Sequence, residues 1–339
     1  PYRRQRQMCI RDSDSIVQNY EKEEFIAGWG QFLPFFIKDG VEVVNDAKGG
    51  RSSRLFINEG RFDNIEKNIS AGDYLLIEFC HNDDASKEYK TMFNRLTPLG
   101  EPDSNGRFPI IPGEAMPKDY IPPEYIDALR KDENVKDKQA VLDSVYKILE
   151  SYPHDTYYPY SADGSKGTYL WFLKQFVDMA REKGAVPVFV TAPARTVYDA
   201  NGNIKDGAGL HGGNNFAYIR AMKQLGEEAK VPVIDLFAYS CGLYKQIGKE
   251  KIHWITSIKK GCNKGIWPDD FNSEMQKKET VSEDTHFNKY GAMLITQGLV
   301  KLIKESDSSQ LDGLKGMLKN PDGIDIEKYV KKPLVFEEF

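Results

Sequence analysis

The sequence predicts an α/β fold built on a parallel sheet of five strands that is covered on both faces. Five short segments are rich in β-branched or aromatic residues and are bounded by turn residues, as buried strands are. Segments with helical spacing of apolar residues lie between them, and such alternation is typical of a parallel sheet. Four of the five strands are nearly continuous in apolar residues, which indicates that helices cover both faces.

Each element follows from its own residue pattern. In Tyr169–Lys183, for example, apolar residues recur every three or four positions from Leu170 to Ala180, which predicts a helix with one buried face. The expected strands are residues Met8–Arg11, Val41–Asn45, Tyr74–Phe79, Val186–Thr191 and Val231–Ile234. The expected helices are residues Phe62–Ser70, Tyr169–Lys183, Phe216–Ala229 and Tyr290–Ile303.

The alternation of strands and helices stops for a long stretch in the middle of the chain. Residues 84–165, approximately, are rich in Pro, Tyr and charge, with helix-like runs at Ile126–Leu129 and Gln139–Leu149. We interpret this stretch as an insertion at the carboxyl edge of the sheet, where long insertions commonly shape binding sites. The expected organisation is one domain over residues 1–305, followed by a tail, residues 306–339, packed on its surface.

Composition excludes several classes of protein. Acidic residues outnumber basic ones by 51 to 46 in 339 residues, for a formal charge of -5, whereas a nucleic-acid-binding protein normally carries a basic surplus. No apolar stretch approaches the roughly 20 residues that a membrane span needs, and no signal peptide is visible. The four cysteines include no CxxC pair, which argues against a structural zinc site and leaves a single Cys241–Cys262 bridge open.

Polar residues follow several of the predicted strands and precede the last helix. Ligands of open α/β sheets bind at the carboxyl ends of the strands, so these residues are candidates for a common site. The segments are Asp14-Ser15, Gly49-Gly50-Arg51-Ser52-Ser53, His81-Asn82-Asp83 and Glu283-Asp284-Thr285-His286.

This set has the chemistry of an acyl-transfer site. A serine needs a base to take its proton, and the base needs an acid to fix its tautomer. The oxyanion of the tetrahedral intermediate needs donors already directed at it, which a glycine N–H and an asparagine amide supply. Each segment also has an ordinary structural explanation as a helix cap or a turn. The prediction depends on all four occurring together at one edge.

The same residues resemble a known family. Ser13-Asp14-Ser15 resembles the first block of the SGNH (GDSL-type) hydrolases, and the whole set is most similar to their rhamnogalacturonan acetylesterase branch. The similarity is dense over residues 13–83 and 168–300 and hardly touches the insertion or the tail. The other matching segments are Gly28–Gln31, Asn45–Ser53, Glu59–Phe62, Gly72–Tyr74, Glu78–Asp83, Asp284–Phe287 and Gly291-Ala292. The resemblance implies a three-layer α/β/α sandwich, similar to flavodoxin, with a central five-stranded sheet.

The resemblance also implies roles for single residues. Ser15 matches the nucleophile and His286 the base. The N–H groups of Ser15 and Gly50 and the side chain of Asn82 match the oxyanion donors. His81 and Asp83 are expected to brace the loop of Asn82.

The acid of the triad has two candidates. The family places it three residues before the histidine, at Glu283, and a residue in that position can fold beneath the imidazole ring. Asp284 lies two residues before His286 and is the alternative. The sequence departs from the family at Ser13 and Cys80, where glycines are expected, and at Glu283, where Asp is expected.

Three further residues are candidates for substrate binding. Arg51 and Arg195 follow predicted strands, and the planar fork of Arg195 suits a substrate carboxylate. His211 lies in a glycine-rich loop, where it either reaches the cleft or faces solvent. The same loop fits GxGxxG, but it follows a polar turn rather than a strand, which excludes a dinucleotide site.

The resemblance implies a serine esterase that removes acetyl groups from acetylated rhamnogalacturonan (pectin), without metal or cofactor. The implied partner is an acetylated polysaccharide or oligosaccharide, with neither nucleic acid nor membrane, and the implied location is secreted or periplasmic. Two alternatives stay open: an esterase of the same fold that acts on another glycan such as acetylated xylan, and a non-catalytic carbohydrate-binding pseudoenzyme.

Overall fold

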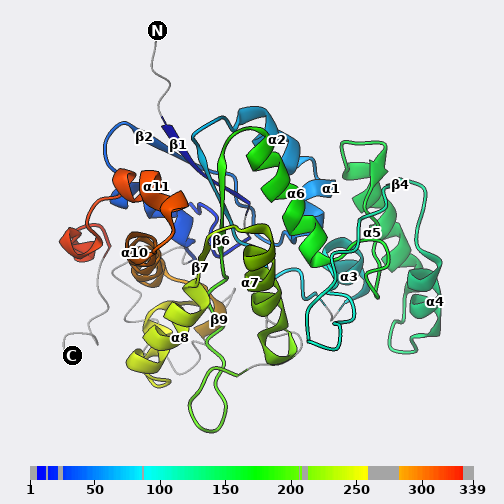
Figure 1. Ribbon diagram of the computed structural model, residues 1–339. Coiled ribbons are helices and arrows are strands. Elements are labelled where there is room, and N and C mark those ends of the chain that lie inside the picture. The colour runs from blue at the N-terminus through cyan, green and yellow to red at the C-terminus, as the bar shows by residue number, and fades with distance from the viewer. Residues whose placement is uncertain are drawn as a thin grey trace. The chain divides into compact units, whose positions relative to one another are not determined.

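The computed structural model describes residues 6–12, 14–21, 26–85, 88–205, 207, 213–258 and 282–330; of residues 6–12, 253, 258, 282 and 283 it describes the backbone alone (Figure 1). The described chain forms two compact units. Unit 1 comprises Pro1–Gly49, Val190–Lys205 and Ile234–Phe339, and unit 2 comprises Gly50–Phe189 and Asp206–Val233.

Unit 1 contains a parallel strand pair and the C-terminal helices. Strands β1 and β2 pair in parallel, with Arg6 opposite Val41 and Ile10 opposite Asn45, and β8 and β9 pair antiparallel. The strands are β1 Arg6–Asp12, β2 Val41–Asn45, β8 Thr256–Ile258 and β9 Ser282–Phe287. The α-helices are α8 Leu236–Ile247, α10 Lys289–Glu305 and α11 Asp312–Met317. Short 3-10 helices cover Trp29–Gln31, Leu33–Phe36, Ile252–Trp254, Ser309–Leu311, Pro321–Gly323 and Ile326–Lys328.

Helix α10 is the main buried helix of unit 1. It begins after Asn288, whose side chain accepts a hydrogen bond from the Gly291 N–H, so an orphan donor of the first turn is satisfied. Its apolar residues Ile295, Leu299 and Ile303 have no exposed surface. The chain beyond residue 306 adds α11, which lies beside α10 in Figure 1 and contacts it.

Unit 2 contains the second parallel strand pair and its covering helices. Tyr74 of β3 stands opposite Val186 of β6, and Ile77 opposite Phe189. Every residue of β3 is buried, as the apolar run predicts. The strands are β3 Tyr74–Ile77, β6 Val186–Val190, which ends in unit 1, and β7 Val233–Ile234, which begins in unit 2. The helices are α1 Ser53–Asn58, α2 Arg61–Asn68, α6 Tyr169–Glu182, the 3-10 turn Asn214–Phe216 and α7 Ala217–Ala229.

The predicted insertion is a largely helical part of unit 2 with its own apolar core. Its elements are α3 Tyr89–Arg95, β4 Met116–Pro117, α4 Pro123–Lys131, α5 Lys138–Ser151 and β5 Thr156–Tyr157. In Figure 1, β4, α4 and α5 gather at one side of this unit. Buried Phe93, Tyr125 and Val145 belong to one cluster, which also takes in Tyr157 and Tyr160. Core packing therefore accounts for Tyr157 and Tyr160 at the end of the insertion.

The parallel pairs, with helices between their strands, confirm the predicted α/β class. All five expected strands occur, and β2 has the predicted bounds, but β3 ends at Ile77 and β7 covers only Val233–Ile234. The expectation that β2 is covered on both faces is wrong, because none of its residues is buried. The possible partner Cys262 lies outside the described residues. In the described ranges, no helix is both long and apolar enough to span a bilayer.

A buried guanidinium ties α1 to the insertion. The side chain of Arg54, 1% exposed, donates to the carbonyl oxygens of Leu96 (Nε, 3.0 Å), Tyr158 (Nη1, 2.9 Å) and Phe93 (Nη2, 2.7 Å). Burial lowers the pKa of this guanidinium, but arginine stays charged in proteins. Three carbonyl acceptors from two segments of the insertion therefore depend on one cation.

Replacing Arg54 by Met should destabilise the protein by at least about 3 kcal/mol, because each buried acceptor that loses its donor costs about 1–3 kcal/mol. Urea unfolding followed by circular dichroism measures this loss. The control is Arg107→Met, which removes an ion pair to Glu228 (2.7 Å) from a side chain that is 45% exposed; its expected cost is about 0–1 kcal/mol. Equal effects of the two substitutions would contradict a structural role for Arg54.

Candidate active site

Ser15 lies in a tight turn directly after β1. The Asp14 carbonyl accepts hydrogen bonds from the N–H groups of Val17 (3.3 Å) and Gln18 (3.2 Å), and the Asp14 carboxylate accepts one from the Ile16 N–H (3.0 Å). Asp14 is fully buried, and Ser15 is 9% exposed. The turn therefore presents the serine on a short, internally bonded segment.

Neighbouring segments of unit 1 hold this turn in place. Asn45, the last residue of β2, donates to the Val17 carbonyl (2.8 Å). A β-carbon on Gly28 would lie 2.4 Å from the Gln18 carbonyl oxygen, so only glycine permits this approach. These contacts give Gly28 and Asn45, which belong to segments that match the family, a structural role in holding the Ser15 turn.

His286 reaches Ser15 from the other end of unit 1. Its Nε2 lies 2.7 Å from the Ser15 Oγ, a hydrogen-bond distance between residues 271 positions apart. The next two residues are anchored: the Phe287 carbonyl accepts from the Ala27 N–H (2.9 Å), and the Asn288 amide donates to the Trp254 carbonyl (2.7 Å). A neutral imidazole in this position can accept the hydroxyl proton of the serine.

Asp284 is bound to Arg195. Its Oδ1 accepts hydrogen bonds from the Arg195 Nε (3.2 Å) and, at shorter distance, from Nη2, and it also accepts from the Thr285 hydroxyl (3.0 Å). The Thr196 N–H donates to the Asp284 carbonyl (2.8 Å). Burial alone would raise the pKa of Asp284, but the hydrogen bonds and charge of Arg195 lower it below its usual value.

Strand β9 is irregular where the two acids lie. Thr256 pairs with Phe287 and Ile258 with Ser282, so a two-residue step on β8 matches a five-residue step on β9. The extra residues form a bulge, and strict alternation of side chains does not hold there. Glu283 lies within this bulge, and the structure describes its backbone only.

In unit 2, Gly50 and Asn82 come together around Arg95. The Arg95 Nη1 donates to the Asn82 Oδ1 (3.3 Å). Gly50 has a φ of 80°, which favours glycine, and a β-carbon there would lie 2.8 Å from the Arg95 Nη2. The two expected oxyanion donors of this unit thus lie beside one guanidinium.

The loop of Asn82 is braced by its neighbour Asp83, as the sequence indicates. The Asp83 Oδ1 accepts from the Ser53 N–H (3.0 Å) and hydroxyl (2.6 Å), at the first residue of α1. The Asp83 carbonyl accepts from the Thr97 N–H (3.0 Å) and the Tyr218 hydroxyl (3.2 Å). His81 is buried.

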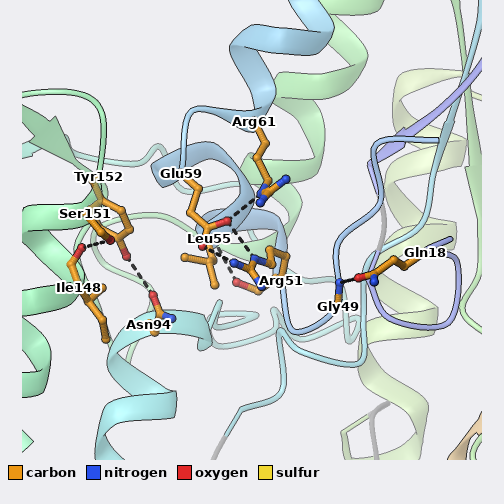
Figure 2. A network of polar contacts seen from close by, with 11 residues as sticks. Gln18, Gly49, Arg51, Leu55, Glu59, Arg61, Asn94, Ile148, Ser151 and Tyr152 are labelled. Atoms are coloured by element: carbon orange, nitrogen blue, oxygen red, sulfur yellow. Dashed lines mark hydrogen bonds and ion pairs between the residues drawn. The ribbon is translucent and has the colours of Figure 1, made fainter. Parts of the chain in front are cut away.

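The substrate-binding candidates have different surroundings. Arg51 is paired with Glu59 (Nε–Oε2 2.9 Å, Nη2–Oε1 2.8 Å), and Figure 2 shows Glu59 between Arg51 and Arg61. Burial would raise the pKa of Glu59, but hydrogen bonds from the two guanidinium groups lower it. The Arg195 guanidinium holds Asp284, and His211 lies outside the described residues.

Sequence reasoning missed Arg95 altogether and did not anticipate the burial of Arg54. Arg95 lies in the insertion, and no sequence motif marks it. The only available signal for Arg54 is its place four residues after Gly50, at the start of an apolar run. Among the described residues, no group of His, Cys, Asp and Glu is arranged to hold a metal ion.

The α/β fold, with a serine hydroxyl hydrogen-bonded to a histidine at the end of a strand, has the features of a hydrolase of the SGNH type. No family model matches the chain. It is 30% identical to rhamnogalacturonan acetylesterase RhgT of Bacillus subtilis over 293 residues, which cover 86% of this chain and 87% of that protein. The probable rhamnogalacturonan acetylesterase YesY of the same organism is 29% identical, with 86% and 90% covered.

A solved structure supports the fold alone. The crystal structure of YxiM of Bacillus subtilis superposes with a TM-score of 0.52 at 19% identity, covering 90% of this chain and 58% of that one. The chain belongs to the rhamnogalacturonan acetylesterase family of SGNH (GDSL-type) hydrolases, and it is a carboxylic ester hydrolase.

The Arg195–Asp284 pair should stabilise the protein in a pH-dependent way. The pKa of Asp284 is lowered on folding, so the pair stabilises above the unfolded value of about 3.9 and loses its effect as the pH falls through the lowered value. The difference in melting temperature between wild type and Asp284→Asn should be largest above about pH 5 and shrink below about pH 4.

The matched control is Asp312→Asn, which removes an exposed pair to Lys315 (3.0 Å) in the same unit. It should change the melting temperature little at any pH. A difference for Asp284→Asn that grows on acidification would contradict the charged pair.

Proposed function

We propose that the protein is a serine esterase that removes acetyl groups from plant cell-wall polysaccharide, with acetylated rhamnogalacturonan as its substrate. The observation that carries the proposal is the 2.7 Å contact between the Ser15 Oγ and the His286 Nε2. The 30% identity to a rhamnogalacturonan acetylesterase over most of both chains supports the choice of substrate.

In the proposed reaction, Ser15 is the nucleophile and His286 the general base. The Oγ attacks the ester carbonyl carbon while its proton passes to the His286 Nε2. Collapse of the tetrahedral intermediate breaks the bond to the sugar oxygen, which takes the proton from His286. Water then attacks the acetyl-serine by the same route, releasing acetate and restoring the serine hydroxyl.

We assign the oxyanion donors to the N–H groups of Ser15 and Gly50 and to the Asn82 amide. Such donors stabilise the negative charge that develops on the carbonyl oxygen. The hydrogen-bonded turn around Ser15 supports the assignment because it holds the backbone on both sides of the serine, and the position of Gly50 and Asn82 beside the Arg95 guanidinium supports it in unit 2.

Glu283 is the proposed acid of the triad. Its position three residues before His286 matches the family, and it lies in the bulge of β9. The engagement of the Asp284 carboxylate by Arg195 supports this choice over Asp284. A bound carboxylate has less freedom to accept a hydrogen bond from the imidazole Nδ1–H.

The proposal extends to the fold and to substrate binding. Two parallel strand pairs, β1 with β2 and β3 with β6, support a five-stranded parallel sheet within the proposed three-layer sandwich. The chain passes between the two units four times, which supports one hydrolase domain rather than two joined by a linker.

Arg51 and Arg195 each hold a carboxylate already, so a role in substrate binding, like that of His211, stays a prediction. Secretion or a periplasmic location follows from the proposed polymer substrate.

Acetate release tests the function. Wild-type protein should release acetate from acetylated rhamnogalacturonan faster than from acetylated xylan, and Ser15→Ala should release almost none while keeping its circular dichroism spectrum. Equal or faster release from xylan would favour the alternative esterase. Binding of either polymer without acetate release would favour the carbohydrate-binding pseudoenzyme.

Two isosteric substitutions test the acid. Glu283→Gln should lower kcat on an aryl acetate by roughly 10,000-fold, because an amide neither fixes the imidazole tautomer nor stabilises the imidazolium. Glu283→Asp, the control, should retain much of the activity, and Asp284→Asn should cost far less than Glu283→Gln. The assignment is reversed if Asp284→Asn is the crippling change and Glu283→Gln stays near wild type.

A further inference from the structure

We propose that Arg95 is a positioning residue that fixes the orientation of the Asn82 side-chain amide. The inference rests on the proposed role of Asn82 as an oxyanion donor. It is carried by the hydrogen bond from the Arg95 Nη1 to the Asn82 Oδ1 (3.3 Å). Both residues belong to unit 2, and Arg95 is the last residue of α3.

The chemistry of the two groups sets the orientation of the amide. A guanidinium only donates hydrogen bonds, whereas an asparagine amide has one accepting and one donating end. The end that faces Arg95 must therefore be the Oδ1, and the Nδ2 is directed to another side. The hydrogen bond from Arg95 therefore disfavours the half-turn of the amide that would present an oxygen where the oxyanion requires a donor.

The backbone on both sides of Arg95 is fixed by buried contacts. Arg54 donates to the carbonyl of Phe93, two residues before Arg95, and to the carbonyl of Leu96, directly after it. The Thr97 hydroxyl donates to the Arg95 carbonyl itself (3.0 Å). The end of α3 is thus held by a fully buried cation.

The loop of Asn82 is tied to the same segment. The Thr97 N–H donates to the Asp83 carbonyl (3.0 Å), which connects the residue after Asn82 to the second residue after Arg95. The Asp83 carboxylate also accepts a hydrogen bond from the hydroxyl of Ser53, the first residue of α1, and Arg54 is the next residue of that helix. The two ends of the Arg95–Asn82 hydrogen bond therefore belong to one connected network.

The same guanidinium lies close to Gly50. A β-carbon on Gly50 would lie 2.8 Å from the Arg95 Nη2 and 3.2 Å from its Cζ. A β-carbon at position 50 would therefore require the Arg95 guanidinium to shift.

This placement gives the insertion a role in the reaction. Helix α3 lies in the insertion, outside the sequence motifs of the family, and it brings Arg95 to the loop of Asn82, which is one of those motifs. The insertion would act on turnover through Asn82, in addition to any contact with the polymer.

The test uses the full chain and two substrates, a neutral aryl acetate and acetylated rhamnogalacturonan. Arg95→Met removes the donors and keeps the aliphatic chain, and Arg95→Lys keeps one charged donor. Arg95→Met should lower kcat about 10- to 100-fold on both substrates with little change in KM, a smaller loss than the roughly 100- to 1000-fold expected for removing an oxyanion donor, as in Asn82→Ala. Arg95→Lys should recover part of the loss.

A double variant separates positioning from an independent effect. Arg95→Met combined with Asn82→Ala should be no slower than Asn82→Ala alone, because Arg95 acts only through that amide. The matched control is Arg130→Met, which changes an exposed arginine near the end of α4 and should leave both rates at the wild-type level. Melting curves of every variant identify a loss of activity that comes from unfolding.

Three results would overturn the proposal. In the first, Arg95→Met keeps the wild-type kcat. In the second, only KM for the charged polymer rises, which would make Arg95 a contact for a substrate carboxylate. In the third, the losses of the two single variants multiply in the double variant. The proposed function is judged separately, by whether wild type releases acetate and Ser15→Ala does not.

The orientation of the amide has a readout that does not depend on turnover. The side-chain amide of Asn82 gives a pair of proton–nitrogen NMR signals, which can be assigned by their loss in Asn82→Ala. These signals should shift strongly in Arg95→Met and weakly in Arg130→Met. Unchanged signals in Arg95→Met would overturn the proposal whether or not the protein is an esterase.

Discussion

One hydrogen bond, between the Ser15 hydroxyl and the His286 imidazole, is the interaction that the rest of unit 1 must hold in place. Its two ends lie 271 positions apart in the chain, so each must be anchored separately. The serine turn is bonded internally through Asp14 and held by the last residue of β2. The histidine is held by the residues after it and by the Arg195–Asp284 pair before it. The Ser15 and His286 side chains keep their relative position because the backbone beside each is hydrogen-bonded and mostly buried.

In unit 2, backbone segments are likewise held by buried contacts, here to the charged side chain of Arg54. The buried guanidinium of Arg54 binds three carbonyls and thereby fixes the end of α3. Taking such a cation out of water is costly, so its hydrogen bonds must all be made for the segment to be stable. In the proposed arrangement, the hydrogen bond from Arg95, at the end of α3, holds the Asn82 amide in turn. Fold stability and placement of the expected oxyanion donor thus depend on the same contacts.

Sequence patterns predicted what is local or periodic. The apolar runs of β2 and β3 and the stripe of α6 mark their elements. The polar residues after the first strand mark Ser15, and those before the last helix mark His286. Contacts between distant segments were not predictable. Arg54 meets carbonyls 39 to 104 positions away, and a backbone carbonyl has no residue-specific signal. Strand β9 was missed because its sequence, Ser-Glu-Asp-Thr-His-Phe, lacks the apolar character of a strand and its ladder is bulged. The engagement of Asp284 by Arg195 depends on a tertiary contact across 89 positions.

The acetyl-enzyme intermediate provides the most direct test of the central claim. Wild-type protein mixed with an excess of an aryl acetate and quenched in acid within milliseconds should carry one acetyl group. Peptide mapping by mass spectrometry should locate that group on Ser15, and the Ser15→Ala variant should carry none. Turnover without an acetyl group on Ser15, or with the acetyl group on another residue, would contradict the account.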